Sequence, residues 1–172
     1  MVNRIADILI KYGAIEFGDF TLASGAKSSY YIDMKTASTN PELLAIIGRE
    51  IAENYEFDVV AGVAVGAVPI AVAVSLASGK PYCIIRKEEK DHGKSGKLIG
   101  DVIDKKVLLV EDVTTSGGSV LFGVDALREN DADISEVVTV VDREQGAFER
   151  LKSAGVRLSA LVKASEIVYI ES

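Results

Sequence analysis

The residues from Val107 to Ser119 bring together side chains that suit a phosphorylated sugar. An apolar run ends in two neighbouring acids, Glu111 and Asp112, and hydroxyl and glycine residues follow. Backbone N–H groups of a glycine-rich turn that opens a helix point outward and bind phosphate. The carboxylates suit ribose hydroxyls, which donate hydrogen bonds, or a nearby cation. We therefore expect a sugar-phosphate site made of the two acids and of the residues after them, Val113, Thr114, Thr115, Ser116, Gly117, Gly118 and Ser119.

Glu111 to Ser119, here called the acid–hydroxyl segment, follows neither of two common nucleotide-binding patterns. The chain lacks the G-x-x-x-x-G-K-[ST] loop and the G-x-G-x-x-G fingerprint. The alternative interpretation is an ordinary strand–turn–helix with a capped first turn. Helix caps seldom come with paired acids and a run of hydroxyl and glycine residues, so the pattern favours a binding site.

A second segment, from Lys87 to Asp101, is polar and glycine-containing and is called the charged loop below. It shows neither helical nor strand periodicity, which is typical of a functional lid or of a disordered segment. Lysine and histidine can stabilise negative charge that develops on a bound phosphate, more strongly once a lid excludes water. The alternative is a solvated charge run, which the nearby sugar-phosphate pattern makes less attractive. The cations gathered here are Lys80, Arg86, Lys87, Lys90, Lys94 and Lys97, with the only histidine, His92, among them.

Arg143 directly follows the strand expected at 137–142. Its guanidinium fork can bind a carboxylate or phosphate through two parallel hydrogen bonds. The alternative is a surface salt bridge with Glu144 or Glu149. The position of Arg143 at a strand end favours a ligand contact, because ligands of parallel sheets bind beyond the carboxyl ends of the strands.

The elements that must position these residues alternate regularly. Residues 3–12 have helical spacing, short strands at 20–22 and 30–34 flank a turn, and Asn40 caps a helix that runs from Pro41 to about Asn54. Apolar, β-branched runs then alternate with helices, which predicts an α/β fold with a parallel sheet covered on both faces. The expected strands are 58–65, 81–86, 106–111, 137–142 and 156–162, and the expected helices are 68–78, 119–130 and 145–154.

Composition limits the classes of protein to consider. A chain of 172 residues that is 48% hydrophobic fits one domain with a real core. Its single cysteine, Cys83, excludes an internal disulfide and is expected to be buried in a strand. A net charge of −7 argues against general nucleic-acid binding. The N-terminal residues do not read as a signal peptide and the most apolar stretch is broken by glycine and proline, so we expect a cytoplasmic protein without a membrane segment.

The acid–hydroxyl segment resembles the motif by which type I phosphoribosyltransferases bind phosphoribosyl pyrophosphate (PRPP). The stretch with Arg86–Lys87, then Lys90–Gly93 and a glycine-spaced continuation to Gly100, resembles the catalytic loop of the orotate-specific members. The resemblance implies a parallel sheet flanked by helices, with about residues 1–40 contributing a small hood to a single domain, 1–172. It also implies transfer of ribose 5-phosphate to orotate, a step of pyrimidine (UMP) biosynthesis, with Mg²⁺ held mainly through PRPP rather than by side chains.

Roles for individual residues follow from the same resemblance. Catalytic roles fall to Lys90, His92 and Asp112, and Arg86 and Lys87 join Lys90 and His92 as PRPP contacts. Orotate contacts fall to Thr115, Arg143, Tyr30, Tyr31 and Lys27. The family further implies a homodimer in which the loop from Lys87 to Gly100 reaches into the partner's site.

Two departures from the family pattern stand out. Ala23 occupies a position where lysine is common, and Lys27, four residues later, is the candidate substitute. Gly66 occupies another lysine position, in a loop, Ala61–Pro69, that matches the family's pyrophosphate loop. Two rival functions stay open at this point: transfer to a different base, and regulation by a protein that binds PRPP without catalysis.

Overall fold

The computed structural model describes residues 3–22, 24–88 and 96–171. Its centre is a six-stranded sheet of order β5-β4-β3-β6-β7-β8. The strands β3 (Val59–Val63), β4 (Tyr82–Ile85), β6 (Lys106–Thr114), β7 (Asp133–Asp142) and β8 (Arg157–Lys163) run parallel. The edge strand β5 (Leu98–Ile99) is antiparallel to β4. The predicted parallel sheet is therefore confirmed except at this edge.

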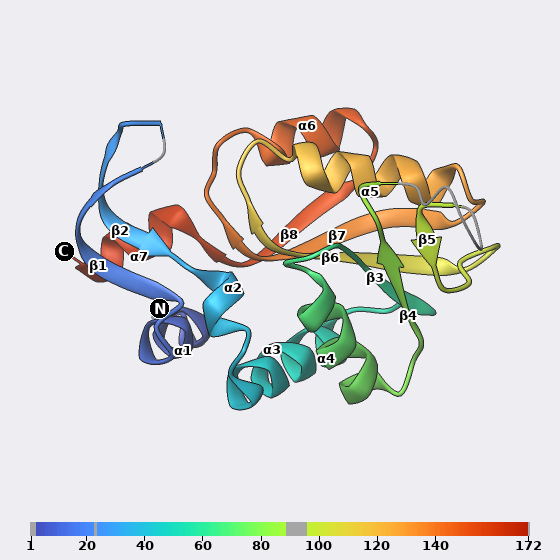
Figure 1. Ribbon diagram of the computed structural model, residues 1–172, viewed down its shortest axis with the longest axis horizontal. Coiled ribbons are helices and arrows are strands. Elements are labelled where there is room, and N and C mark those ends of the chain that lie inside the picture. Colours follow the sequence, from blue (N-terminus) through green and yellow to red (C-terminus); the bar gives the residue numbers. More distant parts are fainter. Residues whose placement is uncertain (1–2, 23, 89–95, 172) are drawn as a thin grey trace.

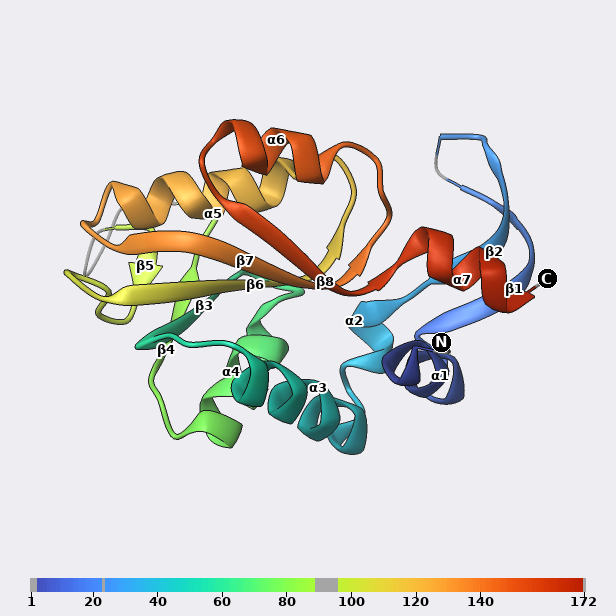
Figure 2. The same ribbon diagram turned by 180° about the vertical axis from the view of Figure 1, so that it is seen from behind.

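Helices cover both faces of the sheet (Figure 1). The helices α5 (Gly118–Arg128) and α6 (Ala147–Ser153) lie on one face, and α3 (Pro41–Asn54) and α4 (Val68–Ser78) lie on the other, as the reverse view also shows (Figure 2). Two hydrophobic clusters fill the two interfaces. Both faces of the strands are thus buried, which explains their continuous apolar sequences.

The hood stands at the carboxyl end of the sheet. It contains α1 (Arg4–Lys11), the antiparallel hairpin of β1 (Ile15–Thr21) and β2 (Lys27–Ile32), and the short helix α2 (Met34–Ala37). The last helix, α7 (Ala164–Glu171), lies beside them, so both ends of the described chain meet at the hood (Figures 1 and 2). Asn3 joins the ends, because its side-chain amide donates to the Leu161 carbonyl at 2.8 Å and to the Glu166 carboxylate at 3.3 Å.

Side-chain caps set the helix starts that the sequence predicted. The Asn40 side chain accepts hydrogen bonds from the backbone N–H groups of Glu42 and Leu43, at 2.9 and 3.2 Å, so α3 begins at Pro41 as expected. Asn3 caps α1 in the same way. The helix α4 has the predicted bounds and ends at Gly79, whose φ of 71° is a conformation that glycine tolerates best.

Several predicted bounds were wrong. The strand expected at 106–111 continues to Thr114 because it stays paired with β7, Val113 opposite Val141 and Thr114 opposite Asp142. The strand expected at 137–142 begins at Asp133, since its polar first residues hide its start. The first hairpin strand is Ile15–Thr21 instead of the expected 20–22, and the second is Lys27–Ile32 instead of 30–34. The elements α2, β5 and α7 were not predicted at all.

Two expectations about exposure have clear outcomes. Cys83 is fully buried in β4, and burial raises the pKa of its thiol to about 11. The prediction of a buried strand cysteine is therefore confirmed. Among the described residues, no helix is long and apolar enough to cross a membrane.

Candidate active site

The chain changes direction across the sheet between β3 and β6, which are neighbours although β4 and β5 lie between them in sequence. At such a switch point, the loops after the two strands separate and leave a crevice for a ligand. The residues after β3 include Gly66, and the end of β6 carries Glu111 and Asp112. The predicted sugar-phosphate residues therefore lie where a parallel sheet normally binds its ligand.

Glu111 and Asp112 form a buried acid pair, with exposed fractions of 6% and 9%. The Glu111 carboxylate accepts a hydrogen bond from the Asp112 backbone N–H at 3.1 Å, and Asp112 accepts one from the Val113 N–H at 2.8 Å. Burial, followed by the hydrogen bond and charge of Asp112, raises the pKa of Glu111 to about 8. A ligand that donates hydroxyl hydrogens or carries a cation would favour the ionised form of this pair.

We expect the titration of Glu111 to lower the protein's free energy of unfolding as the pH rises from about 4.5 to about 8. In that window Glu111 has lost its proton in the unfolded chain but keeps it in the folded chain, so the folded state binds more protons. The stabilisation is complete below the lower pKa and is lost as the pH rises through the upper one. Glu111→Gln should flatten this slope in urea-unfolding measurements made across the window.

The matched control for this prediction is Glu129→Gln, which removes an exposed carboxylate near Lys97. It should keep the slope of the parent protein, because exposed ion pairs contribute little to stability. If the slopes of the Glu111→Gln variant and the parent protein were the same, the proposed proton on Glu111 would be ruled out.

Gly66 lies against the Asp112 carboxylate. A Cβ atom built on Gly66 would lie 2.9 Å from the carboxyl carbon of Asp112 and closer still to one of its oxygens. No side chain fits here unless Asp112 moves. Close packing in the switch-point crevice therefore explains why residue 66 is glycine. The sequence showed only that glycine stands where the family often has lysine.

The turn after β6 exposes hydroxyls at the start of a helix. Thr115, Ser116 and Ser119 are exposed, and the Ser119 side chain offsets part of the rise in the pKa of Glu111. Gly117 has φ of 79°, and a Cβ there would lie 3.1 Å from the Ala147 Cα atom, so both its conformation and its packing require glycine. Gly118 begins α5 and is exposed. The predicted phosphate-binding role of this turn stays a prediction. Thr114, by contrast, is buried and directs its hydroxyl to Asp142 at 3.0 Å.

Arg143 and Tyr30 come together although they lie far apart in sequence. The Arg143 guanidinium carbon is 5.8 Å from the centre of the Tyr30 ring. The Arg143 Nε atom is buried and has no hydrogen-bond partner in the described part of the protein. A buried donor without a partner costs free energy, so this guanidinium is suited to receive an anionic group. The salt bridge with Glu144 or Glu149 that the sequence left open is not formed among the described residues.

Tyr31 and Lys27 lie elsewhere on the hood hairpin. Tyr31 follows Tyr30 on β2, and side chains alternate along a strand, so the two rings point to opposite faces. The Tyr31 ring packs on Phe20, with ring centres 5.5 Å apart. The Lys27 ammonium donates to the Thr21 hydroxyl at 2.7 Å. The structure thus brings Tyr30 to Arg143 but brings neither Tyr31 nor Lys27 to it.

Hydrogen bonds connect Arg86, just before the charged loop, to two residues within that loop. The Arg86 backbone N–H donates to the Lys97 carbonyl at 2.7 Å, and its guanidinium donates to the Gly96 carbonyl at 2.5 Å. Lys87 is exposed beside it. Lys90 and His92 lie outside the described residues, as does Ala23. The predicted roles of Lys90 and His92 stay predictions.

The described residues contain no group of three or more His, Cys, Asp or Glu side chains arranged to hold a metal ion. The acid pair provides hard oxygen atoms, which Mg²⁺ accepts together with oxygens of a bound phosphate. Sequence reasoning gave no role to Asp142, a buried acid that accepts a hydrogen bond from the Thr114 hydroxyl. Its signal was present, since Asp142 ends a strand directly before Arg143.

Known proteins are similar to this chain along nearly all of its length. The sequence model of one protein family, the phosphoribosyl transferase domain, matches residues 27–164. The orotate phosphoribosyltransferase of Methanoculleus marisnigri is 66% identical over 168 residues, which cover 98% of this chain and 99% of that protein.

Two solved structures are similar over nearly their whole length. The orotate phosphoribosyltransferase of Mycobacterium tuberculosis H37Rv in complex with Fe(III) dicitrate gives a TM-score of 0.82 at 31% identity, covering 96% of this chain and 97% of that one. The same protein in complex with PRPP gives 0.77 at 29% identity, covering 96% and 98%. With a matching domain model and such identity along the chain, the protein described here belongs to the orotate phosphoribosyltransferase family.

Proposed function

We propose that this protein transfers ribose 5-phosphate from PRPP to orotate, giving orotidine 5′-monophosphate and pyrophosphate in pyrimidine biosynthesis. The observation that carries the proposal is the meeting of three groups at one end of the sheet. A buried acid pair, an exposed hydroxyl-rich turn and a half-buried arginine, whose Nε atom is buried, beside an aromatic ring lie there together. These groups suit a ribose, its phosphate and a planar anion, which are the parts of the two substrates.

Each part of the site has a chemical task. Glu111 and Asp112 accept hydrogen bonds from the ribose hydroxyls, and the turn from Thr115 to Ser119 holds the 5-phosphate through backbone N–H groups and hydroxyls. Arg143 binds the orotate carboxylate, and Tyr30 packs beside the guanidinium. Thr115 is an additional proposed orotate contact. Fixing both substrates in this way converts a bimolecular reaction into one between oriented neighbours.

In the reaction, the bond between C1 of the ribose and the pyrophosphate oxygen breaks, and pyrophosphate leaves with the electron pair. A ring nitrogen of orotate forms the new bond to C1, and its proton passes to the leaving pyrophosphate or to solvent. Positive charge develops on the ribose and negative charge on the leaving group. Arg86, Lys87, Lys90 and His92 are the proposed partners of pyrophosphate, where fixed cations stabilise the charge that develops.

Mg²⁺ is the proposed cofactor, bound mainly through PRPP oxygens near Asp112 and Glu111. When bound, it would neutralise charge on the pyrophosphate and orient it. The acid pair fits this assignment, because its two carboxylates lie together and a cation would relieve their repulsion. We further propose that residues 1–172 form one domain whose hood is about 1–40. The cytoplasm is the proposed location, since PRPP is highly charged and does not cross a bilayer unaided.

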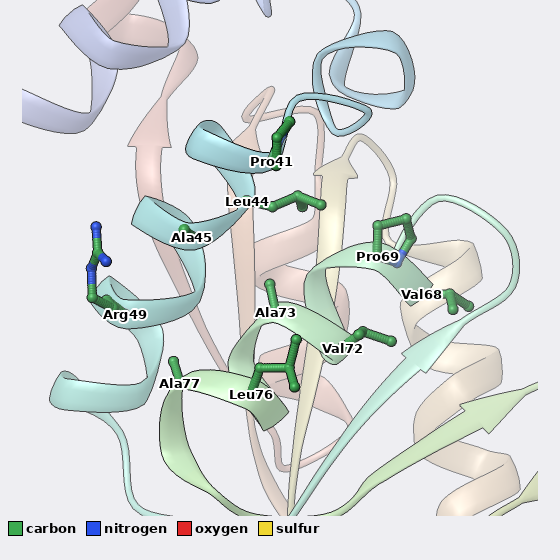
Figure 3. A pocket seen from close by; sticks show the side chains of 10 residues that line it. All are labelled: Pro41, Leu44, Ala45, Arg49, Val68, Pro69, Val72, Ala73, Leu76 and Ala77. Atoms are coloured by element: carbon green, nitrogen blue, oxygen red, sulfur yellow. The ribbon is translucent and has the colours of Figure 1, made fainter.

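The proposed homodimer would use an apolar groove between α3 and α4 (Figure 3). The groove has a volume of about 710 Å³ and is lined by Leu44 on α3 and by Val72 and Leu76 on α4, among others. Leu76 is 81% exposed, although α4 contains no charged residue. A helix that is apolar on all sides is normally covered, and a second copy is the occupant we propose.

The position of the groove supports a second copy rather than another partner. Its residues Val68 and Pro69 directly follow the turn in which Gly66 touches Asp112. A subunit seated on the groove would lie beside the crevice of its neighbour. The loop from Lys87 to Gly100 could be shared across subunits only with such a placement.

We expect Leu76→Glu to convert the dimer to a monomer, because it places a charge in the centre of the apolar contact. Light scattering after size-exclusion chromatography measures the mass directly. The matched control is Phe148→Glu, an equally drastic change at a half-exposed apolar residue on α6, on the other face of the sheet. A dimeric Leu76→Glu variant, or a monomeric parent protein, would contradict the proposed surface.

The proposed function is tested by mixing the protein with PRPP, Mg²⁺ and orotate and following the ultraviolet absorbance of orotate. Loss of the orotate signal that requires both PRPP and Mg²⁺ is the expected result. Pyrophosphate release with another base, but not with orotate, would overturn the acceptor. Tight PRPP binding without turnover of any base would indicate a regulator.

A further inference from the structure

Asp142 is a buried acid to which neither the sequence pattern nor the proposed reaction gives a task. It is the last residue of β7 and is 5% exposed. Within the described residues it forms no ion pair. A buried carboxylate is costly unless it is hydrogen-bonded, so its partners indicate its purpose.

One oxygen of Asp142 joins two parts of the site. Its Oδ1 atom accepts a hydrogen bond from the Thr114 hydroxyl at 3.0 Å and another from the Glu144 backbone N–H, also at 3.0 Å. Thr114 is the residue from which the phosphate-binding turn departs. Glu144 directly follows Arg143 in the chain. The Asp142 oxygen therefore links the residue before the phosphate-binding turn to the backbone next to Arg143.

Backbone contacts close the same unit. The Arg143 backbone N–H donates to the Thr114 carbonyl at 2.9 Å, and Thr114 pairs with Asp142 in the sheet. Glu144 adopts a φ of 56°, a left-handed conformation that is uncommon for residues other than glycine. Its carboxylate accepts the Ser165 backbone N–H at 2.8 Å, which fixes the segment to the start of α7. The backbone on both sides of Arg143 is thereby held.

We propose that Asp142 is a positioning residue that sets the spacing between the phosphate-binding turn and Arg143. The inference depends on the proposed function, because it concerns the spacing between the PRPP ribose and orotate. Asp142 touches neither substrate in this account. It acts through Thr114 and through the backbone of Glu144, and a shift of about 1 Å at this junction would cost roughly a hundredfold in rate.

The test uses two substitutions of the same residue. Asp142→Leu removes the acceptor, and we expect kcat to fall about 10- to 100-fold while the KM for PRPP changes less than about threefold. Asp142→Asn keeps an oxygen acceptor in place and should restore most of the parent kcat. A role confined to stability would lower the melting temperature of the Leu variant without this kcat–KM split or this rescue.

A second pair of variants covers the case in which Asp142→Leu does not fold. Thr114→Val removes one of the two donors and should lower kcat, and Thr114→Ser, which keeps the hydroxyl, should lower kcat much less. Unchanged kcat in both Asp142→Leu and Thr114→Val, or an Asn variant as inactive as the Leu variant, would overturn the proposal. A parent protein without orotate turnover would instead refute the proposed function, so the two failures are distinguishable.

Discussion

Gly66→Ala is expected to lower kcat/KM by about a hundredfold while the protein remains folded. The added methyl group would occupy space that the Asp112 carboxylate fills, since a Cβ at 66 would lie 2.9 Å from the carboxyl carbon. Asp112 must then rotate or the turn after β3 must shift. Either movement displaces the carboxylate that accepts the ribose hydroxyls. Steady-state kinetics with both substrates varied measures the loss.

A double-mutant cycle separates this clash from any general effect of alanine at 66. In an Asp112→Ala background, the atoms that Gly66→Ala meets are gone, so the second substitution should cost little further stability. Chemical unfolding of the four proteins gives the coupling free energy. Additive effects on stability, or full activity of the single Gly66→Ala variant, would show that the contact has no role in holding Asp112.

Arg143→Ala is the second change for which we expect a large effect, a loss of about 100-fold or more in kcat/KM for orotate. Removing one partner of a buried, hydrogen-bonded charge pair costs about 2–5 kcal/mol, and the Nε atom of Arg143 is already buried. The affinity for PRPP should change little, because Arg143 lies on the orotate side of the proposed site. Initial rates at varied orotate, together with calorimetric titration of PRPP, distinguish the two substrates.

Arg157→Ala is the matched control. It removes the same charge from the opposite end of the sheet, where Arg157, with a side chain that is 76% exposed, lies 3.6 Å from Glu136. Such pairs contribute at most about 1 kcal/mol, so activity should be retained. Arg143→Lys should recover only part of the loss, since an ammonium cannot form the paired hydrogen bonds of a guanidinium. An equal loss for orotate and PRPP would argue against a specific orotate contact.

The two predictions concern groups that the fold brings from separate segments. Arg143 is placed by β7 and meets Tyr30 from the hood, whereas Asp112 is placed by β6 and meets the turn after β3. The crevice therefore has two sides, one fixed by the sheet and one contributed by the N-terminal hairpin. This division suits a reaction between two substrates, because each can be oriented by a different part of the fold.

Much of the fold could be predicted from local patterns. Apolar β-branched runs, the Asn40 cap and the glycine after α4 set the alternation of strands and helices, and most helices were predicted to within a few residues. Failures occurred where local signals are weak. The strand β7 begins with polar residues, β5 is only two residues long, and α7 follows a strand without a separating turn.

The chemical groups of the site can be predicted from the sequence, because acids, hydroxyls and glycines lie side by side in one segment and each residue type limits what it can bind. Which distant residues come into contact depends on the folded chain. The contact of Gly66 with Asp112, the bond of Thr114 to Asp142 and the approach of Tyr30 to Arg143 depend on strand order and register. Those are set by the packing of the whole chain, since hydrophobic burial and strand pairing act between segments that no local pattern relates.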